Sequence, residues 1–250
     1  MACVDTLSGT SLDTSAGFER VRYFPRQLLT ADDMRLEQEY FRDKQRRHNR
    51  FLHGWGVVWG LEVRLDPDRG PLAVQICPGY ALGPCGDEIY VPEAIPFDLG
   101  TCLRRPADPC ADSLAATIAM PPAVVVSIRY AECQTRPLRT LQAGCGCDDT
   151  ACEYSRIRDG FDVRCRPGTA IPPSPISPGI CEIEDARATA APAPPAPPVD
   201  PWVDLAQISV VPANGAVSID PAKIDNGVRR RVYSSAMIQQ QVIACCCQAK

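Results

Sequence analysis

The stretch HNRFLHGWGVVWGLEV, residues 48–63, marks a change in the periodicity of the chain. Upstream, apolar residues recur at helical spacing as far as Leu52, and Gly54 is well placed as a left-handed C-cap. Downstream, the period becomes two. Trp55 stands between two glycines, where we expect it to cover the joint or meet a neighbour. We predict a helix that ends near Leu52 and then a strand whose packed face carries Val57, Trp59, Leu61, Val63 and Leu65.

The predicted helix begins after Thr30, a good N-cap, and Asp32 and Asp33 suit the positive end of the helix dipole. Its apolar stripe is thin and half polar, consisting of Met34, Gln38, Phe41, Gln45, His48 and Leu52. Such a seam is more typical of a helix packed on another subunit or on a sheet edge than of a core helix. We therefore interpret residues 23–54 as a docking helix, and the predicted interface comprises Met34, Phe41, His48, Leu52, Trp55 and Trp59.

The only two histidines of the chain are His48 and His53. On an α-helix, residues five apart point about 140° away from each other, so we do not expect the two imidazoles to share a metal ion. The pattern favours a hydrogen bond for His48 and a place at the helix C-terminus for His53. Two histidines organise no Ser/His/Asp or Cys/His arrangement, and we expect the chain not to be an enzyme.

Beyond residue 55 the chain reads as short antiparallel strands separated by turns rich in proline and glycine. Residues 123–133 form a strand, residues 141–160 are irregular, and Asn214-Gly215 is a hairpin signal. The predicted fold is mainly β with flanking α. Its parts are an N-terminal arm (1–22), the docking helix (23–54), a β-rich domain (55–165), a Pro-rich linker or loop (166–201) and a C-terminal hairpin and helix (202–250).

Composition excludes several classes of partner. A net charge of −4 gives no general attraction to nucleic acid or to an anionic membrane. No apolar run approaches the roughly 20 residues that span a bilayer. The N-terminus lacks a basic start followed by an apolar block, so we expect no signal peptide and assembly in the cytoplasm, in an intracellular or released particle.

Fourteen cysteines are many for a chain of 250 residues. The best candidates for a zinc site are Cys133, Cys145, Cys147 and Cys152, since four thiolates bind zinc tetrahedrally. Their spacing is not that of a zinc knuckle, so disulfides and free thiols stay open, and we expect no other cofactor. Cys77 and Cys85 flank a turn and could bridge across it. The adjacent cysteines 245–247 favour intermolecular disulfides or exposed thiols.

Two long stretches carry a resemblance to a known family. RYFPRQLLTADDMRLEQEYFRDKQRRHNRFLHGWGVVWGLEV, followed by VQICPGYALGPCGDEIYVP, resembles bacterial proteins associated with phage-tail-like contractile injection systems. The part GVVWGLEV, PGYAL and GDEIYV is also similar to N-terminal modules of phage tail-fibre and baseplate-attachment proteins. The later IRYAEC, GCGC, EYSRIRDGFDV and WVDLAQISV resemble the rest of the same family. The resemblance covers most of residues 22–235, implies a particle component and implies no catalytic residues.

These observations lead to one hypothesis and two alternatives. The chain is expected to be a structural subunit of a contractile injection system or phage-tail-like particle, peripheral to the baseplate or anchoring a fibre. Its expected partners are the other subunits of that particle and further copies of itself, for example in a trimer. The alternatives are a subunit of another disulfide-linked extracellular filament or surface assembly, and a small metal protein that binds its ion through cysteines.

Overall fold

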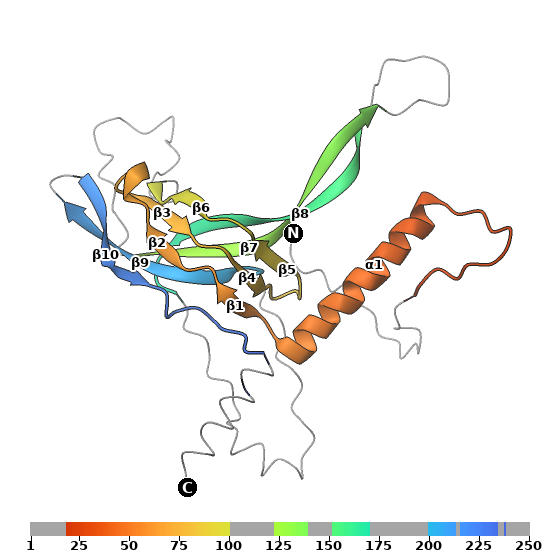
Figure 1. Cartoon of the computed structure of the whole chain (residues 1–250), viewed down its shortest axis with the longest axis horizontal. Coiled ribbons are helices and arrows are strands. Elements are labelled where there is room, and N and C mark those ends of the chain that lie inside the picture. Colours follow the sequence, from red (N-terminus) through yellow and green to blue (C-terminus); the bar gives the residue numbers. More distant parts are fainter. Residues whose placement is uncertain are drawn as a thin grey trace, which may run out of the picture.

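The computed structural model describes residues 19–100, 123–139, 152–170, 200–213, 216–234 and 238. Within these ranges an α-helix, α1 (Ala31–His48), continues into a π-helical turn, η1 (Asn49–His53), and is followed by strands in three antiparallel sheets (Figure 1). A short 3-10 turn, η2 (Pro67–Arg69), connects two of the strands. The prediction of a mainly β fold with an N-terminal helix is confirmed.

Two small sheets are interleaved in sequence. One has the strand order β1 (Gly56–Gly60), β4 (Gly79–Leu82), β5 (Glu88–Val91), and the other has the order β2 (Val63–Leu65), β3 (Ala73–Ile76), β6 (Ile95–Asp98). The single strand predicted over residues 57–65 is therefore wrong. The chain turns at Gly60 and Leu61, which have φ angles of 63° and 55°, and it passes from the first sheet to the second.

The predicted packed face of β1 is wrong for Trp59. Val57 pairs with Ala81, but Trp59 pairs with the next residue, Tyr80, so β1 contains a bulge at Val58. A bulge inserts one residue and interrupts the alternation of faces. Val57 is consequently buried, whereas 53% of Trp59 is exposed.

The third sheet has the order β10 (Ala216–Asp225), β9 (Val203–Ala213), β7 (Ala123–Arg139), β8 (Cys152–Pro167). Ala213 pairs with Ala216, which confirms the predicted hairpin, although its two turn residues lie outside the described ranges. The C-terminal hairpin thus lies in the same sheet as β7. Residues 171–199 of the predicted linker also lie outside the described ranges.

One hydrophobic core joins all three sheets. Its fully buried members are aliphatic, as expected for a chain with only 6% aromatic residues. β7 is central in its sheet, and its run of consecutive apolar residues is buried on both faces. Core residues with no exposed surface come from every sheet and include Ile76, Ile89, Val124, Val126, Ile128, Leu205 and Ile208.

β7 and β8 extend far beyond the core as a hairpin arm, which we define as residues 129–139 and 152–162. β9 pairs with β7 only as far as Ile128, and beyond that point β7 and β8 pair with each other alone, up to Arg139 opposite Cys152. Figure 1 shows this arm leaving the sheet on the same side as α1. Residues 152–160 were predicted to be irregular, which is wrong. Their side chains lack an apolar face because the arm has no core beneath it.

The base of the arm is braced by a stack of side chains. The guanidinium groups of Arg129 and Arg164 lie 4.7 and 4.2 Å from the ring centre of Trp202. Arg129 also forms a 2.7 Å ion pair with Asp162, and Arg164 pairs with Asp200. These contacts lie where the arm begins, so they favour one direction of the arm relative to the sheet.

Candidate docking site formed by the helix and the hairpin arm

The start of α1 is fixed by a capping box. The Thr30 hydroxyl accepts a hydrogen bond from the Asp33 amide, and the Asp33 carboxylate accepts one from the Thr30 amide at 2.8 Å. Hydrogen bonds from Thr30 lower the pKa of Asp33 because they favour its charged form. The predicted N-cap is confirmed.

The end of α1 differs from the sequence prediction. The Gly54 amide donates to the Asn49 carbonyl, five residues back, and residues 49–53 form a π-helical turn before Gly54 at φ 76°. A π-turn places residues five apart on one side. The rings of His48 and His53 therefore meet edge to face with centres 5.4 Å apart, so the predicted separation of about 140° on an α-helix is wrong. The helical segment ends at Gly54 as predicted, but the ψ of −147° differs from the left-handed helical conformation predicted for this glycine.

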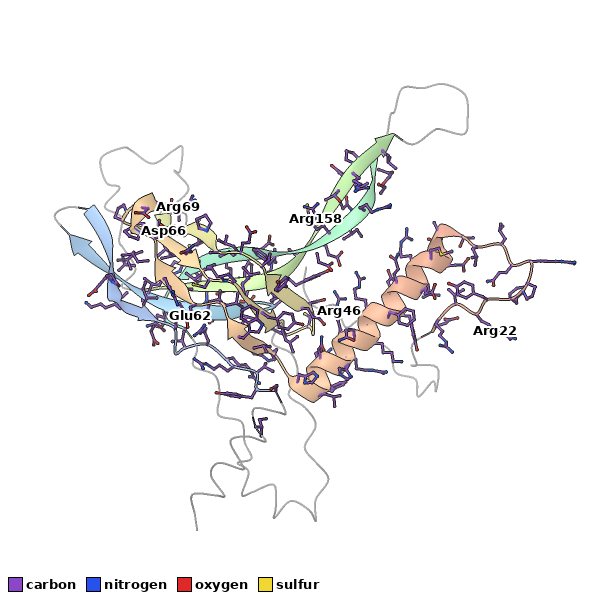
Figure 2. The ribbon with its side chains drawn as sticks, in the orientation of Figure 1. Arg22, Arg46, Glu62, Asp66, Arg69 and Arg158 are labelled. Atoms are coloured by element: carbon purple, nitrogen blue, oxygen red, sulfur yellow. The ribbon has the colours of Figure 1, made fainter. Side chains whose placement is uncertain are left out.

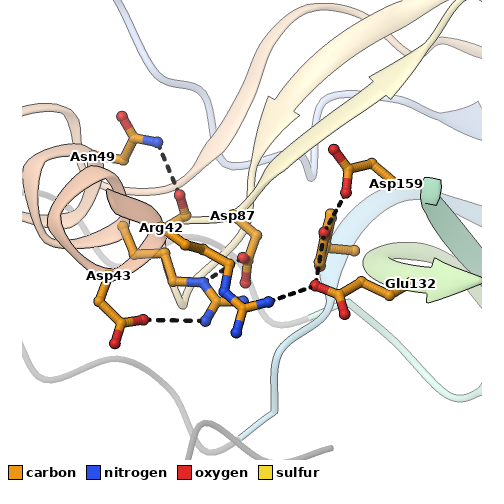
Figure 3. Close-up of polar contacts among 9 residues, drawn as sticks. Arg42, Asp43, Asn49, Asp87, Glu132 and Asp159 are labelled. Atoms are coloured by element: carbon orange, nitrogen blue, oxygen red, sulfur yellow. Dashed lines mark hydrogen bonds and ion pairs between the residues drawn. The ribbon is translucent and has the colours of Figure 1, made fainter. Parts of the chain in front are cut away.

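Polar contacts at its C-terminal half attach α1 to the β core (Figure 3). Arg46 Nε donates to Asp87 at 2.5 Å, and Asn49 Nδ2 donates to the Gly86 carbonyl at 2.8 Å. Arg42 forms a 2.9 Å ion pair with Glu132 on the arm. Partial burial opposes the charge of Arg46, but its pairing with Asp87 outweighs that effect and raises the pKa of Arg46.

Gly86 permits this close approach. A Cβ atom at Gly86 would lie 2.2 Å from the Arg46 carbonyl oxygen, and the residue has a φ of 90°. Both facts disfavour any residue other than glycine at this position. The turn between β4 and β5 is therefore shaped to receive the backbone of the helix.

The remainder of α1 is uncovered. None of its 18 residues, all of which the structure describes, is buried. The predicted interface residues Met34, Phe41 and Leu52 are 44%, 59% and 69% exposed. The segment before the helix adds further exposed apolar side chains, which are Tyr23, Phe24, Leu28 and Leu29. An exposed apolar surface of this extent is typical of a binding surface.

A groove of about 960 Å³ lies between α1 and the hairpin arm. Met34 and Ile157, 61% exposed, line it from the helix and from the arm. At its floor the Tyr130 hydroxyl lies 2.7 Å from Asp159 and 3.1 Å from Glu132. Partial burial and the hydrogen bond to Asp159 raise the pKa of Tyr130, so this phenol stays protonated and links the two carboxylates.

Trp55 is half-buried and packs against the hydrophobic core of its own chain. The guanidinium of Arg230 lies 4.5 Å from its ring centre and donates to its carbonyl at 3.0 Å. Residues 229–232 form a strap along β1, in which the Val57 amide donates to the Arg230 carbonyl at 2.8 Å. Trp55 is therefore a contact within the chain as well as a predicted interface residue.

The strap corrects part of the predicted C-terminal hairpin and helix, residues 202–250. Residues 226–234 are not helical, and helical conformation within the described ranges of this segment occurs at Ile238. The buried Arg229 donates to the carbonyls of Gly60 and Asn226, each at 2.8 Å, and its burial lowers its pKa. These contacts hold the segment extended and satisfy the edge of β1.

The cysteine predictions have a mixed outcome. Cys77 is a free thiol, whereas Cys85 takes part in a disulfide, so the predicted bridge between them is wrong. Cys165 is also disulfide-bonded. Cys133 is free and exposed on the arm, while residues 145, 147 and 245–247 lie outside the described ranges. In the described part of the chain no three His, Cys, Asp or Glu side chains are grouped to hold a metal, and the zinc site stays a prediction.

The fold and the surface define a β-rich chain with two projecting elements and a groove between them. The sequence matches no protein-family model and no curated protein. Among solved structures, one similar chain is in the TssK-TssF-TssG baseplate subcomplex of the type VI secretion system, with a TM-score of 0.38 and 13% identity over 82% of this chain and 60% of that chain. The crystal structure of TssK is similar with a TM-score of 0.37 and 12% identity over 82% and 41% of the respective chains.

The chain thus spans less than two thirds of the length of those neighbours. TM-scores of this size do not define a shared fold, and the likeness to tail-fibre modules stays a prediction. Within the described residues no helix is long and apolar enough to cross a membrane.

Proposed function

We propose that this chain is a structural subunit of a contractile injection system or phage-tail-like particle, which acts by binding other subunits at the periphery of the baseplate or at the base of a fibre. The observation that carries the proposal is the exposed apolar surface of residues 23–52. A capped helix that exposes several large apolar side chains is typical of a surface that binds a partner. The resemblance of residues 22–63 to proteins of contractile injection systems supports a phage-tail-like particle as the assembly.

The arrangement of a rigid core with two projecting elements supports a binding role. The β core supplies rigidity, while α1 and the hairpin arm project from it as two separate contact elements (Figure 1). The groove between them is open, and its lining includes the ion pairs Arg42–Glu132 and Arg46–Asp87. Its described residues do not combine a nucleophile with a general base, the arrangement that acyl-transfer chemistry requires.

The test is the composition of purified particles. Cells that produce the chain with an affinity tag should yield sheath-and-baseplate particles that carry it in a constant ratio to the sheath protein. Residues 239–250 lie outside the described ranges, so the tag should be placed at each terminus in turn. If neither tagged chain is present in intact particles, the proposed function is wrong.

A second candidate is a disulfide-linked extracellular filament or surface assembly. Cys85 and Cys165 are disulfide-bonded, and disulfides persist in oxidising surroundings. Electrophoresis of freshly alkylated material distinguishes the two functions. A covalent ladder that collapses on reduction supports the filament, whereas a single band without reductant supports non-covalent assembly.

A further inference from the structure

The groove between α1 and the arm carries an excess of negative charge. Its charged lining consists of three arginines and five carboxylates, a net charge of −2. Arg42 and Arg46 are already neutralised by Glu132 and Asp87. The carboxylates left without a basic partner among the described residues are Glu39, Glu88 and Asp159.

The hydrogen bonds of these carboxylates do not neutralise them. Tyr130 donates to Asp159, and a hydrogen bond links Tyr80 to Glu88. Burial and this bond raise the pKa of Tyr80 to about 12, so the phenol remains neutral at ordinary pH. The groove therefore suits a ligand with two features. Cationic groups would pair with the carboxylates, and an apolar side chain would pack against Met34 and Ile157.

The same chain presents such a ligand on another surface. We define the basic turn as residues 20–27, whose arginines are Arg20, Arg22 and Arg26. All three are exposed, and none has a carboxylate partner among the described residues. Phe24, 59% exposed, lies between them and provides a large apolar side chain.

Residues 24–27 of the basic turn form a hydrogen-bonded β-turn. The Gln27 amide donates to the Phe24 carbonyl at 3.2 Å, and Pro25 occupies the second position of the turn. Arg26 occupies the third position with a φ of 70°, a conformation usually taken by glycine. A non-glycine residue held in this region marks a constrained and often functional position.

The basic turn lies away from the groove of its own chain. The Tyr23 hydroxyl donates to Glu37, which ties the turn to the side of α1 that does not line the groove. Figure 2 shows Arg22 on the far side of α1 from Arg158, which lies on the hairpin arm. In this structure the basic turn and the groove therefore lie on different sides of α1, so both are accessible to separate copies.

We infer that the groove between α1 and the hairpin arm binds the basic turn of a second copy of this chain. Arg20, Arg22 and Arg26 would face the unpaired carboxylates, and Phe24 would pack between Met34 and Ile157. Because the two surfaces differ, the contact is head to tail, and it produces a closed ring or a growing chain of subunits. This inference goes beyond the proposed function, since self-association requires no particle.

The test uses complementary charge reversal in the full-length chain, with free thiols alkylated so that only non-covalent association is measured. One variant carries Arg20→Glu, Arg22→Glu and Arg26→Glu, and the other carries Glu39→Lys and Glu88→Lys. Sedimentation velocity should show wild-type species heavier than the 27.2 kDa monomer and at least about tenfold weaker association for each variant alone. An equimolar mixture of the two variants should associate again, because each then offers the charge that the other lacks.

The matched control is Arg156→Glu with Arg158→Glu. These exposed arginines alternate along β8 with Ile157 and Asp159, so they lie on the face of the arm that turns away from the groove. The control should associate like the wild type. A monomeric wild type, a mixture that fails to associate, or a control that weakens as much as the test variants would each overturn the inference. A wild type that is monomeric alone but present in particles would overturn this inference and leave the proposed function intact.

Discussion

The β core and α1 are held in the molecule by different kinds of contact. The core joins three sheets through aliphatic side chains with no exposed surface. α1 is joined to that core by a few polar side chains near its C-terminus, and none of its residues is buried. Hydrophobic burial is the main source of folding stability. The comparison shows that the core is buried within one chain, whereas the apolar side chains of the helix stay exposed.

The largest expected effect of a substitution lies in the core. Leu205→Ala should lower the free energy of unfolding by about 2–5 kcal/mol, because it removes buried methyl groups and leaves a cavity. Leu36→Ala is the matched control on α1, where the side chain is 37% exposed. It should change the free energy of unfolding by less than about 0.5 kcal/mol. Urea denaturation of the isolated chain measures both values, and equal losses would contradict the comparison.

The second-largest expected effect concerns the contact between the Gly86 turn and α1. Gly86→Ala combines a positive φ with a Cβ atom that would meet the Arg46 carbonyl, so it should cost about 1–3 kcal/mol and displace α1. Gly70→Ala is the control, since Gly70 has a φ of 126° but no neighbouring atom within 4 Å of its added Cβ. Hydrogen exchange should increase in residues 31–53 for Gly86→Ala alone. Unchanged exchange in residues 31–53 would show that the turn between β4 and β5 does not hold the helix in place.

A smaller effect is expected from the ion pair that attaches α1. Arg46→Met leaves Asp87, whose side chain is 14% exposed, without its partner. We expect a loss of about 1 kcal/mol and faster amide exchange in α1, with the core unaffected. Arg35→Met removes a pair in which both partners are mostly exposed, and it should have no measurable effect. Faster exchange in the core after Arg46→Met would mean that the helix is part of the core's cooperative unit.

The smallest effect is a pH dependence of the start of α1. The pKa of Asp33 is lower in the folded chain than its ordinary value of 3.8, because Thr30 hydrogen-bonds its charged form. Its contribution is therefore complete above the ordinary value and is lost as the pH falls through the lowered value. Amide protection of residues 31–34 should decline in that acidic range for the wild type. Thr30→Ala should remove this dependence, and a variant that keeps it would contradict the role of the cap.

Local signals in the sequence predicted the features that one short segment determines. Thr30 and Gly54 bound the helix as expected, and the Asn214-Gly215 dipeptide lies between two paired strands. The exposed stripe of α1 could be predicted from its mixed polarity, and whether a partner covers it stays a prediction.

Features that depend on distant partners could not be predicted. The two sides of the groove are connected by Arg42 and Glu132, which are 90 positions apart, and no local pattern relates them. The bulge at Val58 and the π-turn before Gly54 each shift the periodicity by one residue, so the predicted packing of Trp59 and the predicted separation of His48 from His53 were wrong. Most of the hairpin arm beyond residue 133 was missed because strands without a core beneath them show no alternation of polarity.

Incorporation of surface variants into particles tests the docking role of α1 most directly. Phe41→Ser with Leu52→Ser removes two large exposed side chains of the apolar surface, and Tyr90→Ser removes one of similar exposure from β5. The isolated chains should unfold at the same urea concentration as the wild type. Particles should then contain the Tyr90 variant at the wild-type ratio to the sheath protein and should lack the Phe41/Leu52 variant. Equal incorporation of both variants would contradict docking through α1.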